Sequence, residues 1–182
     1  MIFFTHSLPP LRGFGEMRYS LSLTMIYYLN IGTNLGDRRA NIAAAVAALE
    51  QRTMGSLRVS DAVETPAWGF SSPNDFLNVG ISLKSHIRPL DMLAILKDIE
   101  RTMGSSVHRD AAGNYADRII DLDIVAIDEM VVDEPTLQVP HKHLARREFF
   151  LRPLAQLAPH WMHPTLHKTA SQLLATLHAT QA

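Results

Sequence analysis

Residues 119–127 have the sequence IIDLDIVAI, in which two aspartates interrupt an apolar and largely β-branched run. A short run of this composition, bounded by Arg118 and Asp128, predicts a β-strand. Because side chains alternate between the faces of a strand, Asp121 and Asp123 point to one face, about 6.5–7 Å apart along the backbone. Like charges on a buried strand repel each other and lose hydration, so the pattern favours a cation between them.

Two interpretations of this aspartate pair remain open at this point. In the first, the pair holds Mg²⁺, a hard ion that binds carboxylates together with substrate phosphates. In the second, the end of the strand emerges into water and both carboxylates are simply solvated. Other parts of the chain are needed to distinguish a metal site from a solvated strand end.

The composition is that of one globular domain with a substantial core, since 47% of the 182 residues are hydrophobic and 19% are charged. With 17 basic and 18 acidic residues the formal net charge is -1, so we expect no binding to nucleic acid or membrane surfaces through overall positive charge. The absence of cysteine excludes disulfides, thiolate metal sites and cysteine nucleophiles, and it fits a cytoplasmic protein. No apolar run reaches the roughly 18 residues of a membrane span. We expect a monomer that acts on small molecules.

The N-terminal segment differs in composition from the rest of the chain. Its apolar start, Met1–Thr5, is soon interrupted by prolines and glycines, and it lacks the basic start and longer apolar stretch of a signal peptide. Met25 stands directly before the first strand-like segment and is a candidate for the physiological start. We therefore expect residues 1–25 to be a weakly ordered extension and residues 26–182 to form a single domain.

Hydrophobic periodicity predicts the order of secondary structure. Strands are expected over 26–31, 57–63, 76–83 and 119–127, and helices from Asp37 to Gly55 and from Pro89 to Gly104. Shorter helices are expected around Leu154 and over 170–177. The β-α-β-β-α-β order is the ferredoxin-like plan of the α+β class, an antiparallel sheet with helices on one face, here followed by a C-terminal helical segment. This plan leaves the opposite face of the sheet free for a site.

Charged residues that suit a nucleotide cluster around the acidic strand. Arg118 precedes it, and His141 and Arg147 follow it, while the chain lacks the GxxxxGK[ST] pattern of a P-loop. Polyphosphate transfer needs carboxylates for a metal and cations that absorb developing charge. Glu100, one position beyond the apolar stripe of its helix, suits a nucleotide ribose or a role in supporting the residues that contact the ligand, whereas as a single exposed helix residue it would carry no function. Each arginine taken singly also fits a solvated surface, but the grouping favours phosphate chemistry.

A second group of residues suits a flat heterocycle. Phe76 and Asn78 share the less apolar face of their strand, Trp68 lies in the preceding loop, and Phe149 follows the arginines. Aromatic rings stack on a planar ligand, while an asparagine amide matches donors and acceptors at its edge. The alternative is ordinary core packing, which we favour for Phe150.

Four motifs, taken in order, resemble those of the hydroxymethyl-dihydropterin pyrophosphokinases of folate biosynthesis. Residues 31–37 (IGTNLGD) resemble the opening motif of that family, and residues 65–69 (TPAWG) with 76–78 (FLN) resemble its pterin-binding segment. Residues 118–124 (RIIDLDI) resemble its metal motif, and VPH at 139–141, REFFLRPL at 147–154 and AP at 158–159 resemble its last motif. The motifs cover roughly residues 26–164, and their joint order is far more specific than any one of them.

The resemblance implies an ATP-dependent pyrophosphokinase, a diphosphotransferase that moves a pyrophosphoryl group from ATP to the hydroxymethyl oxygen of 6-hydroxymethyl-7,8-dihydropterin and releases AMP. It implies two Mg²⁺ ions on the triphosphate, held by Asp121 and Asp123, which form the catalytic set with Arg109 and Arg118. The residues that it implies for the pterin are Thr65, Pro66, Ala67, Trp68, Phe76, Asn78 and Phe149, with the two phenylalanines on either side of the ring. Those that it implies for ATP are Lys97, Glu100, Arg118, Ile124, His141 and Arg147.

The chain departs from the family pattern in the loop between Gly104 and Arg118. The family usually has an arginine directly after the glycine that ends the second long helix, whereas Ser105 stands there in this chain. Arg109 lies a few residues further on and substitutes only if the loop folds inward. Asp117 replaces the usual proline, which puts another negative charge near the metal motif. Without a loop arginine, less charge is neutralised in the transition state and turnover is slow.

Two other functions remain open. A nucleotidyltransferase also combines a glycine-containing polar loop with an acidic strand, but it leaves Phe76, Asn78 and Phe149 unexplained. A pterin- or nucleotide-binding paralogue with weak or lost catalysis is the other, and Ser105 is the residue that favours it. Release of free AMP distinguishes the pyrophosphokinase from both.

Overall fold

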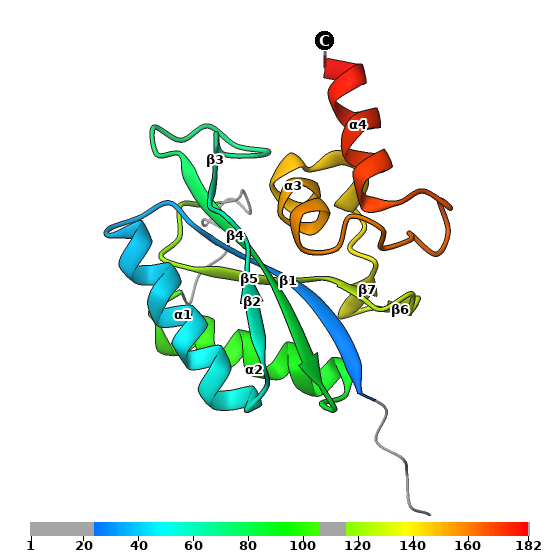
Figure 1. The fold of residues 1–182 in the computed structure, drawn as a ribbon. Helices are drawn as coiled ribbons and strands as arrows, with labels where there is room; N and C mark the ends of the chain where they lie inside the picture. The colour runs from blue at the N-terminus through cyan, green and yellow to red at the C-terminus, as the bar shows by residue number, and fades with distance from the viewer. Residues whose placement is uncertain (1–23, 106–115, 182) are drawn as a thin grey trace, which may run out of the picture.

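A computed structural model of the chain describes residues 24–105 and 116–181. The expected N-terminal extension lies outside these residues except for Thr24 and Met25, and Arg109 also lies outside them. In the described part of the chain, no helix is both long enough and apolar enough to cross a membrane. The fold is mixed α and β, with helices on both faces of an antiparallel sheet (Figure 1).

The described residues form a main sheet of five strands in which every pairing is antiparallel. The strands are β1 (Met25–Thr33), β2 (Leu57–Val59), β3 (Val63–Thr65), β4 (Phe76–Ser85) and β5 (Asp121–Ile127). Their order across the sheet is β2-β4-β1-β5, and β3 also pairs with β4. The acidic strand β5 therefore lies at an edge of the sheet, beside β1.

The single strand expected over 57–63 is wrong, because the structure has two short strands, β2 and β3, along one side of β4. The pairing register with β4 shifts by one residue between them. The shift falls between Ser60 and Val63, after a pairing in which the Ser60 backbone N–H donates to the C=O of Gly80 at 2.9 Å and its Oγ accepts from the backbone N–H of Gly80 at 2.8 Å. A one-residue shift of this kind leaves little trace in the hydrophobic alternation.

Helices α1 (Arg38–Thr53) and α2 (Pro89–Thr102) cover one face of the sheet (Figure 1). Their apolar stripes pack against the alternating apolar side chains of β4 and form the larger core, as the spacing predicted. The Asp37 side chain accepts a hydrogen bond from the backbone N–H of Ala40 at 3.0 Å, which confirms the expected helix cap.

The expected end of α1 at Gly55 is wrong. The helix ends at Thr53, and Met54 adopts the left-handed conformation with a φ of 49°. Gly55 instead lies close to β4, because a Cβ atom there would be 2.7 Å from the backbone oxygen of Lys84. Close packing against the sheet, and not termination of the helix, accounts for this glycine.

The other face of the sheet is partly covered, contrary to the expectation that it is free. Helix α3 (Glu148–Leu157) packs over it, α4 (Ala170–Gln181) packs against α3, and the two helices form a second core with β5 (Figure 1). A Cβ atom at Gly80 in β4 would lie 2.6 Å from Cβ of Pro153, so α3 lies directly against the strand. The end of this face that carries the two aspartates stays open.

The segment between β5 and α3 returns the chain to the open end of the sheet. It contains a hairpin of β6 (Val132–Glu134) and β7 (Leu137–Val139), followed by a short 3₁₀ helix, η1 (Leu144–Arg146). After β7 the backbone N–H of His141 donates to the C=O of Val125 at 2.9 Å. This contact places the basic residues that follow β7 beside the acidic strand.

Candidate active site

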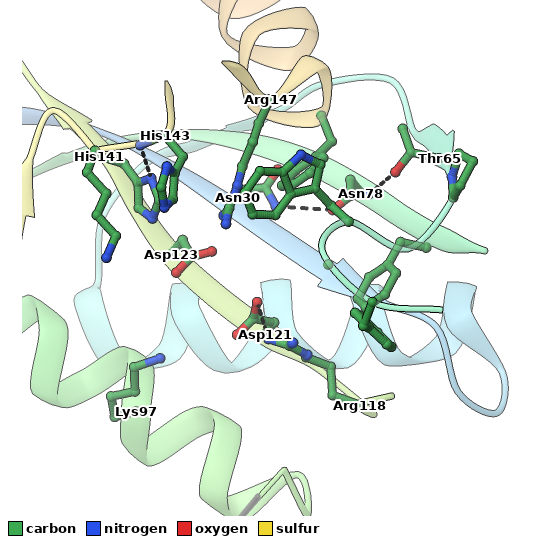
Figure 2. A pocket seen from close by; sticks show the side chains of 17 residues that line it. Asn30, Thr65, Asn78, Lys97, Arg118, Asp121, Asp123, His141, His143 and Arg147 are labelled. Carbon is green, nitrogen blue, oxygen red and sulfur yellow. Dashed lines mark hydrogen bonds and ion pairs between the residues drawn. The ribbon is translucent and has the colours of Figure 1, made fainter. Parts of the chain in front are cut away.

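Two rows of paired residues, two positions apart along β1, form the floor of the site. In one, Gly32 of β1 lies between Asn78 of β4 and Asp121 of β5, and in the other, Asn30 lies directly opposite Asp123. Residues directly opposite each other in a sheet point to the same face. The two aspartates therefore share a face, as expected, and both line one pocket of about 220 Å³ (Figure 2).

The pocket brings together most of the residues that the sequence singles out. Those that line it are Thr65, Pro66, Trp68, Phe76, Asn78, Lys97, Arg118, Asp121, Asp123, His141, Arg147 and Phe149. Three expected residues lie elsewhere, with Ala67 in the loop, Glu100 beneath the strand and Ile124 in a neighbouring cavity. Gly32, from the opening motif, also lines the pocket, and the sequence did not indicate four further lining residues, which are Asn30, Phe70, Lys142 and His143. Alternation along β1 could have revealed Asn30, because it shares a strand face with Gly32.

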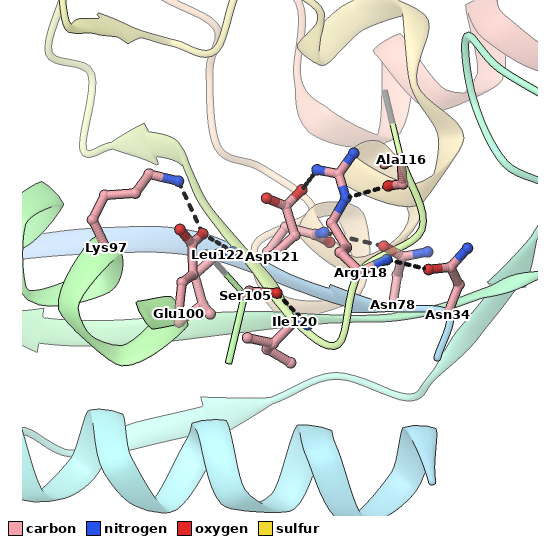
Figure 3. A network of polar contacts seen from close by, with 11 residues as sticks. Asn34, Asn78, Lys97, Glu100, Ser105, Ala116, Arg118, Ile120, Asp121 and Leu122 are labelled. Atoms are coloured by element: carbon pink, nitrogen blue, oxygen red, sulfur yellow. Dashed lines mark hydrogen bonds and ion pairs between the residues drawn. The ribbon is translucent and has the colours of Figure 1, made fainter. Parts of the chain in front are cut away.

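The two carboxylates differ in how far nearby positive charge offsets their negative charge. Burial and the neighbouring charge of Asp121 raise the pKa of Asp123 to about 7. Asp121 itself pairs with Arg118, whose Nη1 donates to Asp121 Oδ2 at 2.8 Å (Figure 3). Burial opposes the charge on Lys97, but Glu100 and the two aspartates outweigh burial and raise the pKa of Lys97. The pocket thus favours additional positive charge beside Asp123.

This donor set fits Mg²⁺. Among the described residues, no group of three or more His, Cys, Asp or Glu side chains converges as a metal site made of protein ligands alone would need. Asp121 and Asp123 instead offer two carboxylates to the same pocket. Mg²⁺ commonly binds through one or two carboxylates together with substrate phosphates and water, so the pair suits Mg²⁺ bound with a phosphorylated ligand.

Glu100 lies beneath the site and supports it. The residue is 1% exposed, and its Oε1 accepts hydrogen bonds from the backbone N–H of Leu122 at 2.7 Å and from Lys97 Nζ at 2.9 Å (Figure 3). The interpretation of Glu100 as a plain exposed helix residue is therefore wrong. Because Leu122 lies between the two aspartates in β5, Glu100 ties α2 to the strand that carries them.

The two described ends of the loop that departs from the family pattern are held to the rest of the fold by hydrogen bonds. Ser105 is buried, and its Oγ accepts a hydrogen bond from the backbone N–H of Ile120 at 3.0 Å (Figure 3). At the other end, Asp117 accepts hydrogen bonds from Asn34 Nδ2 at 2.7 Å and from Asn74 Nδ2 at 2.9 Å. Both residues therefore hold the entry to β5, and neither is part of the pocket lining.

Two arginines of the pocket lie close to aromatic rings that also line it. The centre of the Trp68 ring lies 4.1 Å from the guanidinium carbon of Arg147, and Phe149 lies 5.4 Å from the same carbon. The centre of the Phe76 ring lies 5.8 Å from the guanidinium carbon of Arg118. Both phenylalanines that were expected beside a planar ligand thus line the pocket, each close to an arginine.

His141 is held in its neutral form. Burial, followed by the positive charge of Arg147, lowers the pKa of His141 to about 3. Its ring centre lies 4.8 Å from that of Phe150, which is buried in the second core, as expected. A neutral imidazole can form a hydrogen bond to a phosphate or a heterocycle without adding charge.

A second cavity, of about 330 Å³, adjoins the first. Both cavities are lined by Lys97, Asp123, His141 and Lys142, and the second extends over residues of α2, β5 and β7. Two ligands can therefore lie side by side with Asp123 between them. Such an arrangement suits the transfer of a group from one bound molecule to another.

Comparison with known sequences gives the same family as the motifs. The sequence pattern of the 7,8-dihydro-6-hydroxymethylpterin-pyrophosphokinase (HPPK) family matches residues 28–159. A Porphyromonas gingivalis protein named 2-amino-4-hydroxy-6-hydroxymethyldihydropteridine pyrophosphokinase is 41% identical over 140 residues, which are 76% of this chain and 94% of that protein. A protein of the same name from Aquifex aeolicus is 33% identical over 141 residues, which are 78% of this chain and 85% of that protein.

A solved structure shares the fold. Wild-type Plasmodium falciparum HPPK-DHPS with SDX-DHP matches with a TM-score of 0.70 at 16% identity, over 87% of this chain. Because the match spans only 45% of that longer chain, it supports the fold alone. The family pattern, in contrast, extends over most of this chain, and the Porphyromonas relative is matched over nearly its whole length. The chain therefore belongs to the 7,8-dihydro-6-hydroxymethylpterin-pyrophosphokinase family.

Proposed function

We propose that the protein transfers a pyrophosphoryl group from ATP to the hydroxymethyl group of 6-hydroxymethyl-7,8-dihydropterin and releases AMP, a step of folate biosynthesis. Membership of the family supports this activity, as do the names of the Porphyromonas and Aquifex relatives. The structural observation that carries the proposal is that Asp123 lines both of two adjoining cavities. A donor in one cavity and an acceptor in the other would meet beside this carboxylate.

The pterin binds in the first pocket, on its aromatic side. Phe76 and Phe149 flank the ring, the side chain of Asn78 binds its edge, and the backbone of residues 65–68 completes the hydrogen bonding. In support, the amide of Asn78 is already oriented, because its Nδ2 donates to Thr65 Oγ1 at 3.3 Å. An amide that is fixed before binding loses little conformational freedom when a ligand arrives.

ATP binds across the second cavity, with its phosphates directed to the first. Ile124 lines the second cavity, and Lys97 and His141 line both, which supports contact with the nucleotide. Arg118 and Arg147 line the first pocket and contact the phosphates. Glu100 acts on the nucleotide through Lys97, with which it is paired, and so is a positioning residue.

The reaction joins the pterin oxygen to the β-phosphorus of ATP. As that bond forms, the bond from the β-phosphorus to the α-phosphate oxygen breaks, AMP leaves, and the hydroxyl proton passes to water. The protein holds the two substrates in line and neutralises charge, since this chemistry needs little covalent work from it. Arg118 and, from the loop outside the described residues, Arg109 supply positive charge to the phosphates. Asp121 and Asp123 would hold two Mg²⁺ ions, which would supply positive charge that offsets the charge of the phosphates.

We also propose a ferredoxin-like fold, a single-domain organisation and a monomeric state for the protein. When β2 and β3 are counted as one strand, the order β-α-β-β-α-β and the antiparallel neighbours correspond to the ferredoxin-like plan. A single domain over residues 26–182 and a weakly ordered extension over 1–25 can be tested by limited proteolysis. We propose a cytoplasmic monomer, and sedimentation tests the oligomeric state.

One incubation tests the proposed activity. The protein is mixed with ATP, Mg²⁺ and 6-hydroxymethyl-7,8-dihydropterin, and we expect free AMP and a pterin diphosphate as products. A nucleotidyltransferase would instead attach AMP to the acceptor and release pyrophosphate. A paralogue without catalysis would bind the pterin in calorimetry and form no AMP. Omission of the pterin is the control, because AMP formed without it would come from hydrolysis of ATP.

A further inference from the structure

An asparagine in the floor of the pocket has a side-chain oxygen that accepts no hydrogen bond from the described residues of the free protein. Asn30 is 4% exposed and lies beside Asn78 in the pocket (Figure 2). Its Nδ2 donates to Asn78 Oδ1 at 3.2 Å, whereas its Oδ1 is buried and has no hydrogen-bond partner among residues 24–105 and 116–181. Leaving a buried acceptor unpaired is unfavourable and uncommon, so this oxygen calls for an explanation.

The backbone around Asn30 keeps its amide within the pocket. Gly32 is the next residue on the same strand face, and a Cβ atom there would lie 2.7 Å from Asn78 Oδ1. A glycine at this position therefore allows Asn78 to reach Asn30 across β1. On its other side, Asn30 lies directly opposite Asp123. One amide thus connects the aromatic half of the pocket with its acidic half.

The amide of Asn30 is the last member of a short chain of hydrogen bonds. Asn30 donates to Asn78, and Asn78 Nδ2 donates to Thr65 Oγ1 at 3.3 Å. The unused Oδ1 at the end of this chain can only accept, so its partner must carry an N–H or O–H group. A 7,8-dihydropterin carries such donors on its ring nitrogens and on its exocyclic amine.

We propose that Asn30 determines specificity for the pterin, with its Oδ1 accepting a hydrogen bond from an N–H group of the bound ring and its Nδ2 holding the amide of Asn78 in place. This inference rests on the proposed function, because it takes the pterin as the occupant of the pocket. Binding satisfies an oxygen that is unsatisfied in the free protein. The Oδ1 atom of Asn30 therefore contributes to ligand affinity and not to the stability of the free protein.

The test uses Asn30→Ala and Asn30→Leu in the full-length protein. Calorimetry measures the Kd of 6-hydroxymethyl-7,8-dihydropterin and, separately, that of a non-hydrolysable ATP analogue with Mg²⁺. We expect both variants to bind the pterin roughly tenfold more weakly and to keep the nucleotide Kd within about twofold. The Tm of the free variants should stay close to that of the wild type, because the lost hydrogen bond to Asn78 is offset by removal of the unpaired Oδ1 of Asn30. Leucine fills the space that alanine leaves, so agreement between the variants excludes an effect of a cavity.

Ser60→Ala is the matched control. Ser60 is also a buried polar residue bonded to the sheet, since its Oγ accepts from the backbone N–H of Gly80 at 2.8 Å, but it lies outside the pocket. This control should lower the Tm and leave the pterin Kd unchanged.

Three outcomes would overturn the assignment of Asn30. A wild-type pterin Kd in both Asn30 variants would overturn it and leave the proposed function standing. Equal weakening of pterin and nucleotide binding, together with a Tm lowered as in Ser60→Ala, would show that Asn30 only supports the sheet. A wild-type protein that binds no pterin would overturn the proposed function as well.

Discussion

The Trp68 ring stacks on Arg147, with the guanidinium carbon 4.1 Å from the ring centre. Trp68 is 41% exposed in the loop before β4, whereas Arg147 is buried at the start of α3. The contact therefore joins two segments that border the pocket, and at an exposed site a contact of this kind is worth about 0.5–1 kcal/mol. A phosphate that binds Arg147 would have to share the guanidinium with the indole ring.

This stacking predicts a change of tryptophan fluorescence when ATP and Mg²⁺ bind. The chain has two tryptophans, Trp68 in the pocket and Trp161 in the second core. We expect the change to be lost in Trp68→Phe and kept in Trp161→Phe. A signal of wild-type size in Trp68→Phe would show that the Trp68–Arg147 contact is not altered by the nucleotide.

Replacement of Asp123 by asparagine should abolish Mg²⁺-dependent turnover and keep the fold. Loss of a carboxylate that positions the charge-neutralising ions should lower kcat by at least about 100-fold. Because burial and Asp121 raise the pKa of Asp123 to about 7, the neutral side chain should also stabilise the metal-free protein at pH 8, by roughly 1–3 kcal/mol. Steady-state AMP release and chemical denaturation measure the two effects.

Asp133→Asn is the control for this substitution, because Asp133 is an exposed carboxylate on β6, outside both cavities. It should change neither turnover nor stability. Turnover of Asp123→Asn at the wild-type rate would remove Asp123 from the metal site.

Glu100→Ala and Glu100→Gln should differ in stability. Glutamine keeps an oxygen that can accept from the backbone N–H of Leu122, whereas alanine leaves this buried N–H unpaired. We expect Glu100→Ala to lower the free energy of unfolding by roughly 2–4 kcal/mol and Glu100→Gln to lower it by less than about 1.5 kcal/mol. Urea denaturation measures both. Equal stability of the two variants would mean that the bond to Leu122 does not hold β5 to α2.

His141 should contribute to the loss of stability in acid. Burial and Arg147 lower its folded pKa to about 3, so the unfolded chain takes up a proton below about pH 6.5 and the folded protein does not. The contribution of His141 is therefore complete above pH 6.5 and falls as the pH decreases toward 3, by about 2 kcal/mol at pH 5. His141→Gln should flatten the dependence of unfolding free energy on pH between 5 and 7. His160→Gln, on the surface, should not, and an unchanged slope in His141→Gln would contradict the burial of a neutral imidazole.

The features that the sequence predicted correctly depend on local periodicity. Alternation along β5 was sufficient to place Asp121 and Asp123 on one face, because a strand has no other way to direct residues two apart. The same alternation in β4 separated its apolar core face from Phe76 and Asn78. The apolar spacing of α1 and α2 predicted the helical face that covers the sheet.

The features that the sequence did not reveal depend on contacts between distant segments. Glu100 looked exposed because its helical position lies beyond the apolar stripe, but its partner is a backbone N–H of Leu122 in another element. Helix α3 can pack against the second face of the sheet because Gly80 has no side chain and leaves room for Pro153. Asn30 interrupts an apolar strand, and although alternation along β1 puts it on the same face as Gly32, its neighbours Asp123 and Asn78 follow only from the pairing of distant strands.

The proposed activity depends on the acidic strand β5 holding divalent cations between two bound substrates. The most direct measurement is a crystal structure with a non-hydrolysable ATP analogue, the pterin, and Mn²⁺ in place of Mg²⁺, with anomalous scattering to locate the metal. We expect anomalous peaks about 2 Å from oxygens of Asp121, Asp123 and the triphosphate. A triphosphate bound with its metal away from both carboxylates would contradict the claim.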